Sequence, residues 1–142
     1  GMKVIAHDLF PKTMPGVEMK TMEQVLTGAD AIVLHTTHEE KNKNLIGQKE
    51  IGQMKNGVIV VNTVDRDLVD ENAMAEAIKS GKVYGYAYEG EDLENTPLAK
   101  LDNAVGLKGF AWYTKEALAN LFQILTDNVI VLADNNPRNR VV

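Results

Sequence analysis

Cysteine is absent from this sequence of 142 residues, and its absence excludes several kinds of site. Disulfides, thiolate-bound metal ions and cysteine nucleophiles all require that residue, and nothing in the composition indicates an oxidising compartment. The sequence also lacks internal repeats and low-complexity linkers. A chain of this length without such breaks is expected to form one domain over residues 1–142.

Positive charge and long apolar runs are also scarce. Lys and Arg number 15 against 20 Asp and Glu, which gives a formal net charge of -5. This balance argues against general nucleic-acid binding, which needs cations to neutralise phosphates. No apolar run approaches the roughly 20 residues of a membrane span, and the segment after Met2 becomes polar too soon for a signal peptide. We therefore expect no nucleic-acid or membrane partner and a cytoplasmic location.

What the chain does contain is a regular alternation of short apolar runs and helical patterns. This alternation predicts βα units, and hence an α/β fold with a doubly wound, mostly parallel sheet. Helices are expected after Thr21, around Ile51, from Asp70 to Ser80, and after Thr114. The expected strands are Lys3–His7, Ala31–His35, Val58–Asn62, Val83–Glu89 and Ala104–Leu107.

Two of these strands carry a distinct burial pattern. Ala31–His35 is a continuous apolar run, which predicts a strand that is buried on both faces. Val83–Glu89 alternates three tyrosines with smaller residues, which predicts a strand with two unlike faces. The tyrosines expected on one face are Tyr84, Tyr86 and Tyr88.

The most specific segment is Gly57–Glu71, which reads G-V-I-V-V-N-T-V-D-R-D-L-V-D-E. It resembles the D-isomer-specific 2-hydroxyacid dehydrogenases, in which a buried strand ends in N-T-A-R-G-G and continues through L-V-D-E into a helix. The similarity extends over essentially the whole chain and is strongest in Val58–Glu71 and Gly85–Leu101. It implies a Rossmann domain that binds NAD in an NAD-dependent oxidoreductase.

The sequence departs from the family at its beginning. The family's cofactor domain starts with a strand, a G-x-G-x-x-G loop and a helix, and its next strand often reads F-G-M-K-V-I-A-Y-D. This sequence begins directly with G-M-K-V-I-A-H-D and contains no such loop. The loop matters because its backbone N–H groups hold the pyrophosphate. The resemblance therefore implies a truncated domain whose binding of NAD is weak or absent.

The resemblance assigns cofactor-binding roles to six positions at strand ends. Asp8 would accept hydrogen bonds from the adenosine ribose, although it could instead cap a turn before Pro11. His35 and Thr36 stand where the family has H-V-P, although they could instead bond to their own loop. The remaining positions that the resemblance implies are Asn62, Thr63 and Glu89.

The reactive positions of the family are mostly replaced. The family uses an Arg that binds the substrate carboxylate, a His that moves the hydroxyl proton and a Glu that orients the His. These roles fall at Asp65, Gly109 and Glu94, and Arg66 lies one place late. Only Glu94 is retained, and it has no histidine to orient. We therefore expect this chain alone to be catalytically inactive.

Three aspartates lie close together after the Val58–Asn62 strand. Asp65, Asp67 and Asp70 have the chemistry of a hard-cation site. Asp70 fits better as the N-cap of a helix, and acidic groups at strand ends are commonly solvated. We therefore expect no metal site.

The lack of the family's central strand would leave its two neighbours apart. We expect Lys3–His7 to close inward onto Ala31–His35, which would give a flavodoxin-like strand order. We also expect a homodimer, because the long helix Thr114–Ala133 carries an apolar stripe. Two alternatives to an inactive dehydrogenase remnant remain. The chain could be a protein-interaction or oligomerisation module, or one half of a split dehydrogenase whose companion chain carries the glycine-rich loop.

Overall fold

Strands and helices alternate along the first 109 residues, as the apolar pattern predicts. The computed structural model describes residues 1–109 and 112–139, and the chain divides into two compact units, Gly1–Gly109 and Phe110–Val142. The expectation of one domain over residues 1–142 stays a prediction. The helices of the first unit are α1 (Met22–Gly28), α2 (Gln48–Gln53) and α3 (Glu71–Lys79).

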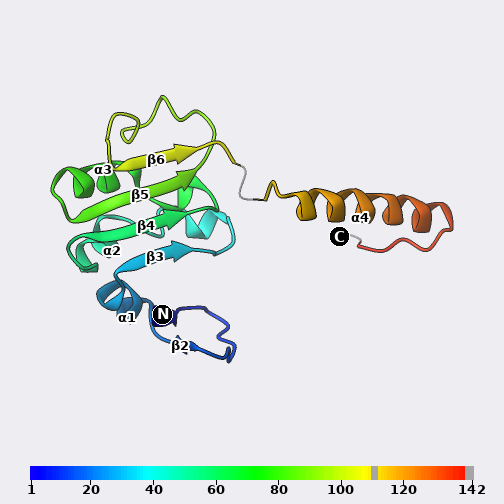
Figure 1. Cartoon of the computed structure of the whole chain (residues 1–142), viewed down its shortest axis with the longest axis horizontal. Coiled ribbons are helices and arrows are strands. Elements are labelled where there is room, and N and C mark those ends of the chain that lie inside the picture. Colours follow the sequence, from blue (N-terminus) through cyan, green and yellow to red (C-terminus); the bar gives the residue numbers. More distant parts are fainter. Residues whose placement is uncertain (110–111, 140–142) are drawn as a thin grey trace. The chain divides into compact units, whose positions relative to one another are not determined.

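A four-stranded parallel sheet forms the centre of the first unit (Figure 1). The strand order is β3-β4-β5-β6, and all three pairings are parallel, which confirms the predicted α/β class. Parallel neighbours need a crossover connection, and α2 and α3 lie on two of the three crossovers. The strands are Ala31–Leu34 (β3), Val58–Asn62 (β4), Val83–Glu89 (β5) and Ala104–Leu107 (β6).

The helices begin at the residues that the sequence marks. Thr21 and Gln24 form a reciprocal capping box at the start of α1. The Asp70 carboxylate accepts hydrogen bonds from the first backbone N–H groups of α3, which fixes the direction in which this helix leaves the sheet. Gly81, with a φ of 77°, ends the turn after α3. These termini were all predicted.

The hydrophobic core lies on one face of the sheet. In the view of Figure 1, the strands lie in front of α2 and α3, which cover this face. The buried strand residues follow a period of two, as expected when one face is covered. They pack with Leu26 of α1, Ile51 of α2 and Met74 of α3. The strand residues in this core are Ile32, Leu34, Val58, Val60, Val83, Tyr86 and Tyr88.

The opposite face of the sheet is exposed or half-buried along all four strands. Ala31 and Val33 of β3 are exposed, although burial on both faces was predicted, so that prediction is wrong. The reason is that no helix of the described part of Gly1–Gly109 buries this face. Its large apolar side chains and their exposed fractions are Val33 at 50%, Ile59 at 43%, Val105 at 52% and Leu107 at 42%.

An irregularity in the register of β5 separates its three tyrosines. Val58 pairs with Val83, but Ile59 pairs with Gly85, so Tyr84 is an extra residue opposite β4. Tyr84 is 66% exposed. Tyr86 and Tyr88 are buried and stack with ring centroids 5.1 Å apart. The prediction of a single tyrosine face is therefore wrong for Tyr84.

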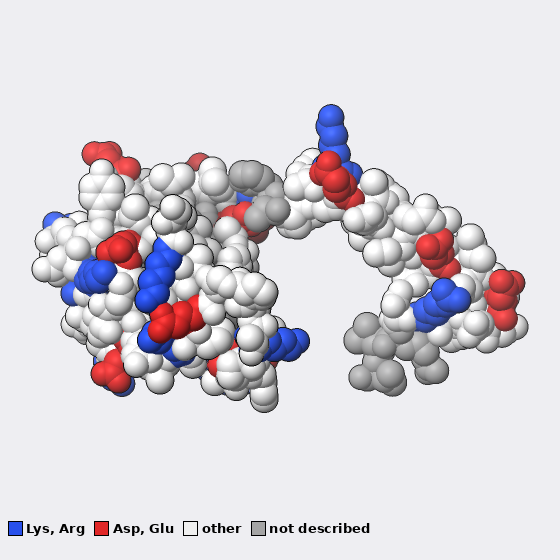
Figure 2. Space-filling model, turned by 60° about the horizontal axis from the view of Figure 1, so that its bottom comes forward, with Lys and Arg blue, Asp and Glu red and all other residues white. Residues whose placement is uncertain are grey.

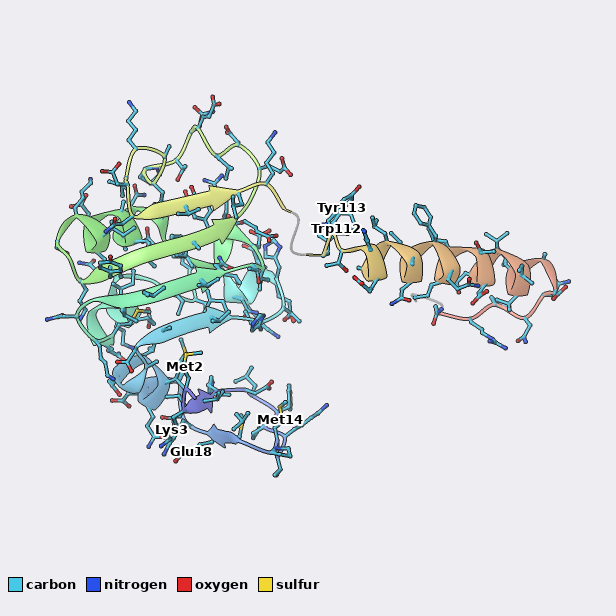
Figure 3. The ribbon with its side chains drawn as sticks, viewed as in Figure 1. Met2, Lys3, Met14, Glu18, Trp112 and Tyr113 are labelled. Atoms are coloured by element: carbon cyan, nitrogen blue, oxygen red, sulfur yellow. The ribbon has the colours of Figure 1, made fainter. Side chains whose placement is uncertain are left out.

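The N-terminal residues form a separate two-stranded sheet. Strands β1 (Val4–Ala6) and β2 (Val17–Met19) pair in parallel, and β2 was not predicted. Lys20 and Lys3 both bond to the Glu18 carboxylate and hold its pKa at about 2. Figure 3 shows Lys3 and Glu18 together on this small sheet.

The predicted inward closure of Lys3–His7 onto Ala31–His35 is wrong. Strand β1 pairs with β2, and the first strand in the order of the large sheet is β3, which pairs with β4. The flavodoxin-like order therefore does not form. The β1–β2 pair forms across a crossover of only ten residues, and its hydrogen bonds extend to the one from Lys20 N to Ala6 O at 2.8 Å. The open edges of β1 and β3 remain.

The second unit is dominated by α4 (Lys115–Ala133), which starts after the predicted cap Thr114. None of its residues is buried, and its surface is mostly uncharged (Figure 2). By length and composition alone α4 could cross a membrane, a test that core helices of globular proteins also pass. Its large exposed apolar residues are Leu121, Phe122, Ile124, Leu125, Val129, Ile130 and Leu132.

Candidate functional site

The carboxyl ends of the parallel strands meet at one edge of the sheet, where ligands bind in open α/β sheets. Asn62, the last residue of β4, is fully buried there. Its amide nitrogen donates to the Asp65 carbonyl at 2.7 Å and to the Tyr86 hydroxyl at 3.3 Å, and its oxygen accepts from the Val64 N–H at 3.1 Å. Asn62 therefore shapes the turn that carries Asp65 instead of presenting its side chain to solvent.

Both carboxylate oxygens of Asp65, which is half-buried, have a partner within the chain. One carboxylate oxygen accepts from the Asp67 N–H at 2.9 Å, which caps the short 3₁₀ helix Arg66–Leu68. The other lies 3.3 Å from Nδ1 of His38. No local sequence pattern indicates this pair, because His38 lies 27 positions away and follows a different strand. A negative group thus occupies the position where the family resemblance expects a cation.

Arg66 turns in another direction, toward α3 and the loop after β5. Its Nε and Nη2 atoms bond to the two carboxylate oxygens of Glu71 at 2.6 and 2.8 Å. Its Nη1 donates to the carbonyls of Glu91 and Asp92 at 2.7 and 3.1 Å. The guanidinium also lies over the ring of Tyr88, 5.9 Å from its centroid. The guanidinium of Arg66 therefore holds the loop after β5 and does not reach the place that the family resemblance assigns to an Arg at position 65.

The pKa shifts of this ion pair agree with its geometry. The hydrogen bond to Glu71 raises the pKa of Arg66. Burial alone would raise the pKa of Glu71, but the hydrogen bonds from Arg66 and from the Thr96 hydroxyl outweigh it, so the pKa is lowered. The Arg66–Glu71 pair is therefore charged at neutral pH. It holds the loop after β5 at two places, through the carbonyls of Glu91 and Asp92 and through the Thr96 hydroxyl.

The loop after β5 carries Glu94, the one catalytic position predicted to be retained. Glu94 is exposed on this loop. Asp92 has a φ of 46°, and its carboxylate accepts from the Asn95 side chain at 2.7 Å. A Cβ on Gly90 would lie 2.2 Å from Cδ of Arg66, so this position is closed by Arg66. The first residues of the loop that carries Glu94 are therefore held in place by Arg66.

The other predicted site residues lie at the ends of their strands. The Asp8 carboxylate accepts from the Phe10 N–H at 2.7 Å, so Asp8 caps a turn. His35 is exposed, and the Thr36 hydroxyl accepts from Asn42 at 3.5 Å. Thr63 is exposed directly after β4. Their predicted cofactor roles remain predictions.

Glu89, the last residue of β5, lies close to Gly109, which follows β6 by two positions. Glu89 is half-buried at the last position of β5. A Cβ added to Gly109 would lie 3.8 Å from Oε2 of Glu89, which is an ordinary contact distance. Gly109 therefore has space for a side chain but supplies none that could carry a proton.

His38, Asp65 and Asp67 each offer a ligand atom within 4.8 Å of the others. This cluster differs from the one considered from sequence, since Asp70 is used as the cap of α3. His38 and Asp67 are exposed and Asp65 is half-buried, as is common for acidic groups that hold no ion. The geometry therefore brings Asp65 and Asp67 together with a residue that sequence reasoning set aside.

Comparison with known proteins decides the family. The model of the D-isomer specific 2-hydroxyacid dehydrogenase NAD binding domain matches residues 1–107 of the 142. The chain belongs to this dehydrogenase family. The match includes β1 to β6 and every candidate site residue described above except Gly109.

Relatives of this dehydrogenase domain are considerably longer. It is 36% identical to D-3-phosphoglycerate dehydrogenase of Archaeoglobus fulgidus, over 99% of this chain and 28% of that protein. It is 34% identical to glycerate dehydrogenase of Methylorubrum extorquens, over 99% of this chain and 46% of that protein. The chain therefore spans less than half the length of these two relatives.

Solved structures confirm the Rossmann-like fold of the dehydrogenase domain. The apo-structure of D-lactate dehydrogenase from Escherichia coli matches with a TM-score of 0.89 and 28% identity, over 100% of this chain and 47% of that one. The NAD-complexed D-isomer specific 2-hydroxyacid dehydrogenase from Lactobacillus delbrueckii ssp. bulgaricus matches with a TM-score of 0.87 and 26% identity, over 99% and 48%. NAD is therefore the cofactor that the family implies.

The residues of this chain fit only part of a dinucleotide. Polar side chains stand at the strand ends, but a pyrophosphate needs a backbone cradle at a helix N-terminus. Gly16, Gly57 and Gly81 have positive φ, yet nothing lies within 4 Å of where their Cβ atoms would be. They are turn residues in open space and do not form such a cradle. Among the described residues, these three turns therefore do not supply the cradle that the pyrophosphate of NAD needs.

Proposed function

We propose that this chain, acting alone, is a catalytically inactive NAD-binding-domain remnant of a D-2-hydroxyacid dehydrogenase. The observation that supports the proposal best is the state of position 65. Asp65 stands where the family resemblance expects the substrate-binding Arg, and it is held there by the Asp67 N–H and by His38. A carboxylate in this place repels the carboxylate of a 2-hydroxy acid by about 4 kcal/mol at 4 Å in a surface-like dielectric.

The remaining groups do not compensate for this replacement. Arg66 is the cation nearest to Asp65 in the sequence, but its guanidinium donates to Glu71 and to two loop carbonyls. Gly109, at the position of the family's histidine, has no side chain to exchange a proton with a hydroxyl group. The loss of a general acid–base group typically slows a reaction by about 10²–10⁴-fold. Glu94 keeps its family position but has no partner there to orient.

The test is a steady-state assay of the purified chain with NADH and pyruvate, glyoxylate or hydroxypyruvate. Glycerate dehydrogenase of Methylorubrum extorquens serves as the positive control. We expect no reduction above the rate without protein. Turnover that disappears in Glu94→Gln would overturn the proposal, because it would show that the retained glutamate still works.

A second candidate function is self-association, which α4 favours. The large exposed apolar residues of α4 between Leu121 and Leu132 are 44–66% exposed. Such a continuous stripe is typical of an interface. We infer a homodimer in which α4 contacts a second copy, in a cytoplasmic protein. Sedimentation at micromolar concentration tests this, with Leu125→Asp as the disrupting variant and Gln123→Asp on the same helix as its control. A monomeric parent chain would refute it.

A further inference from the structure

The turn between α2 and β4 contains the one asparagine–glycine pair of the sequence, Asn56–Gly57. Both residues are exposed, and Val58, the first residue of β4, follows them. Gly57 has a φ of 76°, and nothing lies within 4 Å of where its Cβ would be. The turn lies at the amino ends of the strands, whereas the candidate site lies at their carboxyl ends. Chemistry at this turn is therefore separate from the residues considered for the dehydrogenase reaction.

An asparagine that precedes a glycine can lose its side-chain amide without an enzyme. The backbone nitrogen of the glycine attacks Cγ of the asparagine and closes a five-membered succinimide ring. The bond from Cγ to Nδ2 breaks, and the amide nitrogen leaves as ammonia together with the proton of the glycine N–H. Water then opens the ring and leaves either aspartate or isoaspartate. Glycine favours the attack because it has no Cβ to obstruct it and rotates freely about its backbone bonds.

We propose that Asn56 is a site of spontaneous deamidation in the folded chain. Water reaches the exposed turn, and Gly57 has open space around it. The side-chain oxygen of Asn56 accepts a hydrogen bond from Nζ of Lys82 at 3.2 Å. This bond polarises the side-chain carbonyl and stabilises the negative charge that develops on its oxygen during the attack. Among the described residues, no hydrogen bond holds the departing Nδ2.

One hydrogen bond restrains the reaction in the folded chain. The Gly57 N–H donates to the carbonyl of Lys82 at 2.9 Å, next to the first β4–β5 pair, Val58 and Val83. Gly57 must release this bond before its nitrogen can attack. A bond at the end of a ladder and beside an exposed turn opens at a low free energy. We therefore expect deamidation of Asn56 to be about tenfold slower in the folded chain than in the unfolded chain, and not abolished.

The two products differ in their effect on the fold because of Lys82. Its ammonium group, on a half-buried side chain, donates to the Met54 carbonyl at the end of α2 as well as to Asn56. Aspartate at position 56 places a carboxylate beside a cation that is already held there, so the turn is retained. Isoaspartate adds one carbon to the backbone before Gly57. That carbon displaces the Gly57 N–H from the Lys82 carbonyl and disturbs the start of β4.

The test follows the mass of each peptide of the full chain during incubation at mildly alkaline pH. We expect the peptide that contains Asn56 to gain about 1 Da, about tenfold faster than any other asparagine reacts. Asn56→Gln should remove this gain, because its ring would need six members, while its amide can still accept from Lys82. Asn72→Gln, on the exposed side of α3, is the matched control and should leave the gain at Asn56 unchanged.

A parallel sample unfolded in urea sets the time scale. No gain at Asn56 in the folded chain, over a time in which the unfolded chain reacts there completely, overturns the proposal. Equal gains at several asparagines overturn it as well. Asn56→Asp supplies the first product directly and should not lower the urea midpoint of the parent chain. The same substitution should be less favourable in a Lys82→Met background, and an equal effect in both backgrounds would refute the role of Lys82. None of these outcomes depends on whether the chain is an enzyme.

Discussion

Arg66 and Glu71 form a two-pronged ion pair, with both guanidinium–carboxylate distances below 3 Å and side chains only 22% and 17% exposed. Glu71 is the first residue of α3, and Arg66 reaches past it to the carbonyls of the loop after β5. The pair therefore ties the turn after β4, the start of α3 and the loop of Glu94 into one polar unit.

Removal of the Arg66 side chain should destabilise the chain considerably. Arg66→Ala leaves the Glu71 carboxylate partly buried without a cation, and we expect a loss of about 2–3 kcal/mol in the free energy of unfolding. Arg66→Lys should not restore it, because a lysine cannot make the two-pronged contact. Urea unfolding measures both. Lys79→Ala removes the exposed pair with Glu76 and is the control, expected below about 0.5 kcal/mol. Equal losses for the two alanine variants would contradict the role of Arg66.

The same pair should make stability depend on pH in the acid range. The pKa of Glu71 is lower in the folded chain than its ordinary value near 4.5. Its contribution is therefore complete above that ordinary value and is lost as the pH falls through the lower, folded value. Glu71→Gln should be less stable than the parent at pH 7, and the difference should shrink toward pH 3. Unfolding curves at both pH values check this, and a constant difference would refute it.

Two glycines should respond in opposite ways to a methyl group. Gly90→Ala would drive Cβ into Cδ and Cγ of Arg66, at 2.2 and 2.8 Å, so Arg66 must move. We expect a loss of about 1–3 kcal/mol. Gly52 lies within α2 with nothing within 4 Å of its Cβ position, and Gly52→Ala should stabilise the chain by about 0.5–1 kcal/mol. Thermal unfolding of the two variants distinguishes them, and a neutral Gly90→Ala would show that Arg66 yields without cost.

Cofactor binding should be weak and should depend on Asp8. Without a pyrophosphate loop, we expect NAD to bind weakly or not at all, and any binding to prefer NAD over NADP because the Asp8 carboxylate repels a 2′-phosphate. Asp8→Asn should reduce that preference while keeping the turn to Phe10, since its amide oxygen can accept the same hydrogen bond. Calorimetry with both cofactors is the measurement. Tight binding of NADPH to the parent chain would contradict the prediction.

Much of the fold was predictable because its signals are local. The apolar run Val58–Asn62, the capping box at Thr21 and the cap at Asp70 each depend on neighbouring residues. The exposure of Val33 was not predictable, because burial of a second face depends on which other elements are present. Strand β2 could not be predicted, because it is only three residues long, too short to show an alternating pattern, and is stabilised by its pairing with β1.

The candidate site shows the same division. The replacements predicted at Asp65 and Gly109 come from the resemblance to the family motif, and they stay predictions. The Asp65–His38 contact and the path of Arg66 could not, because both join segments that are distant in sequence and are set by how the strands end. Gly90 is the local signal that another group approaches the backbone there. In the structure that group is Arg66, which also donates to the carbonyl of the next residue, Glu91.

The small β1–β2 sheet also has a consequence for how the chain opens. It is held by three residue pairs, and no hydrogen-bonded ladder joins it to the larger sheet. Cooperative unfolding therefore need not include both sheets at once. We expect residues up to Lys20 to open at a lower free energy than the larger sheet, because three short residue pairs hold them. Asp8 follows β1 directly, so the position of its carboxylate depends on whether this small sheet is formed.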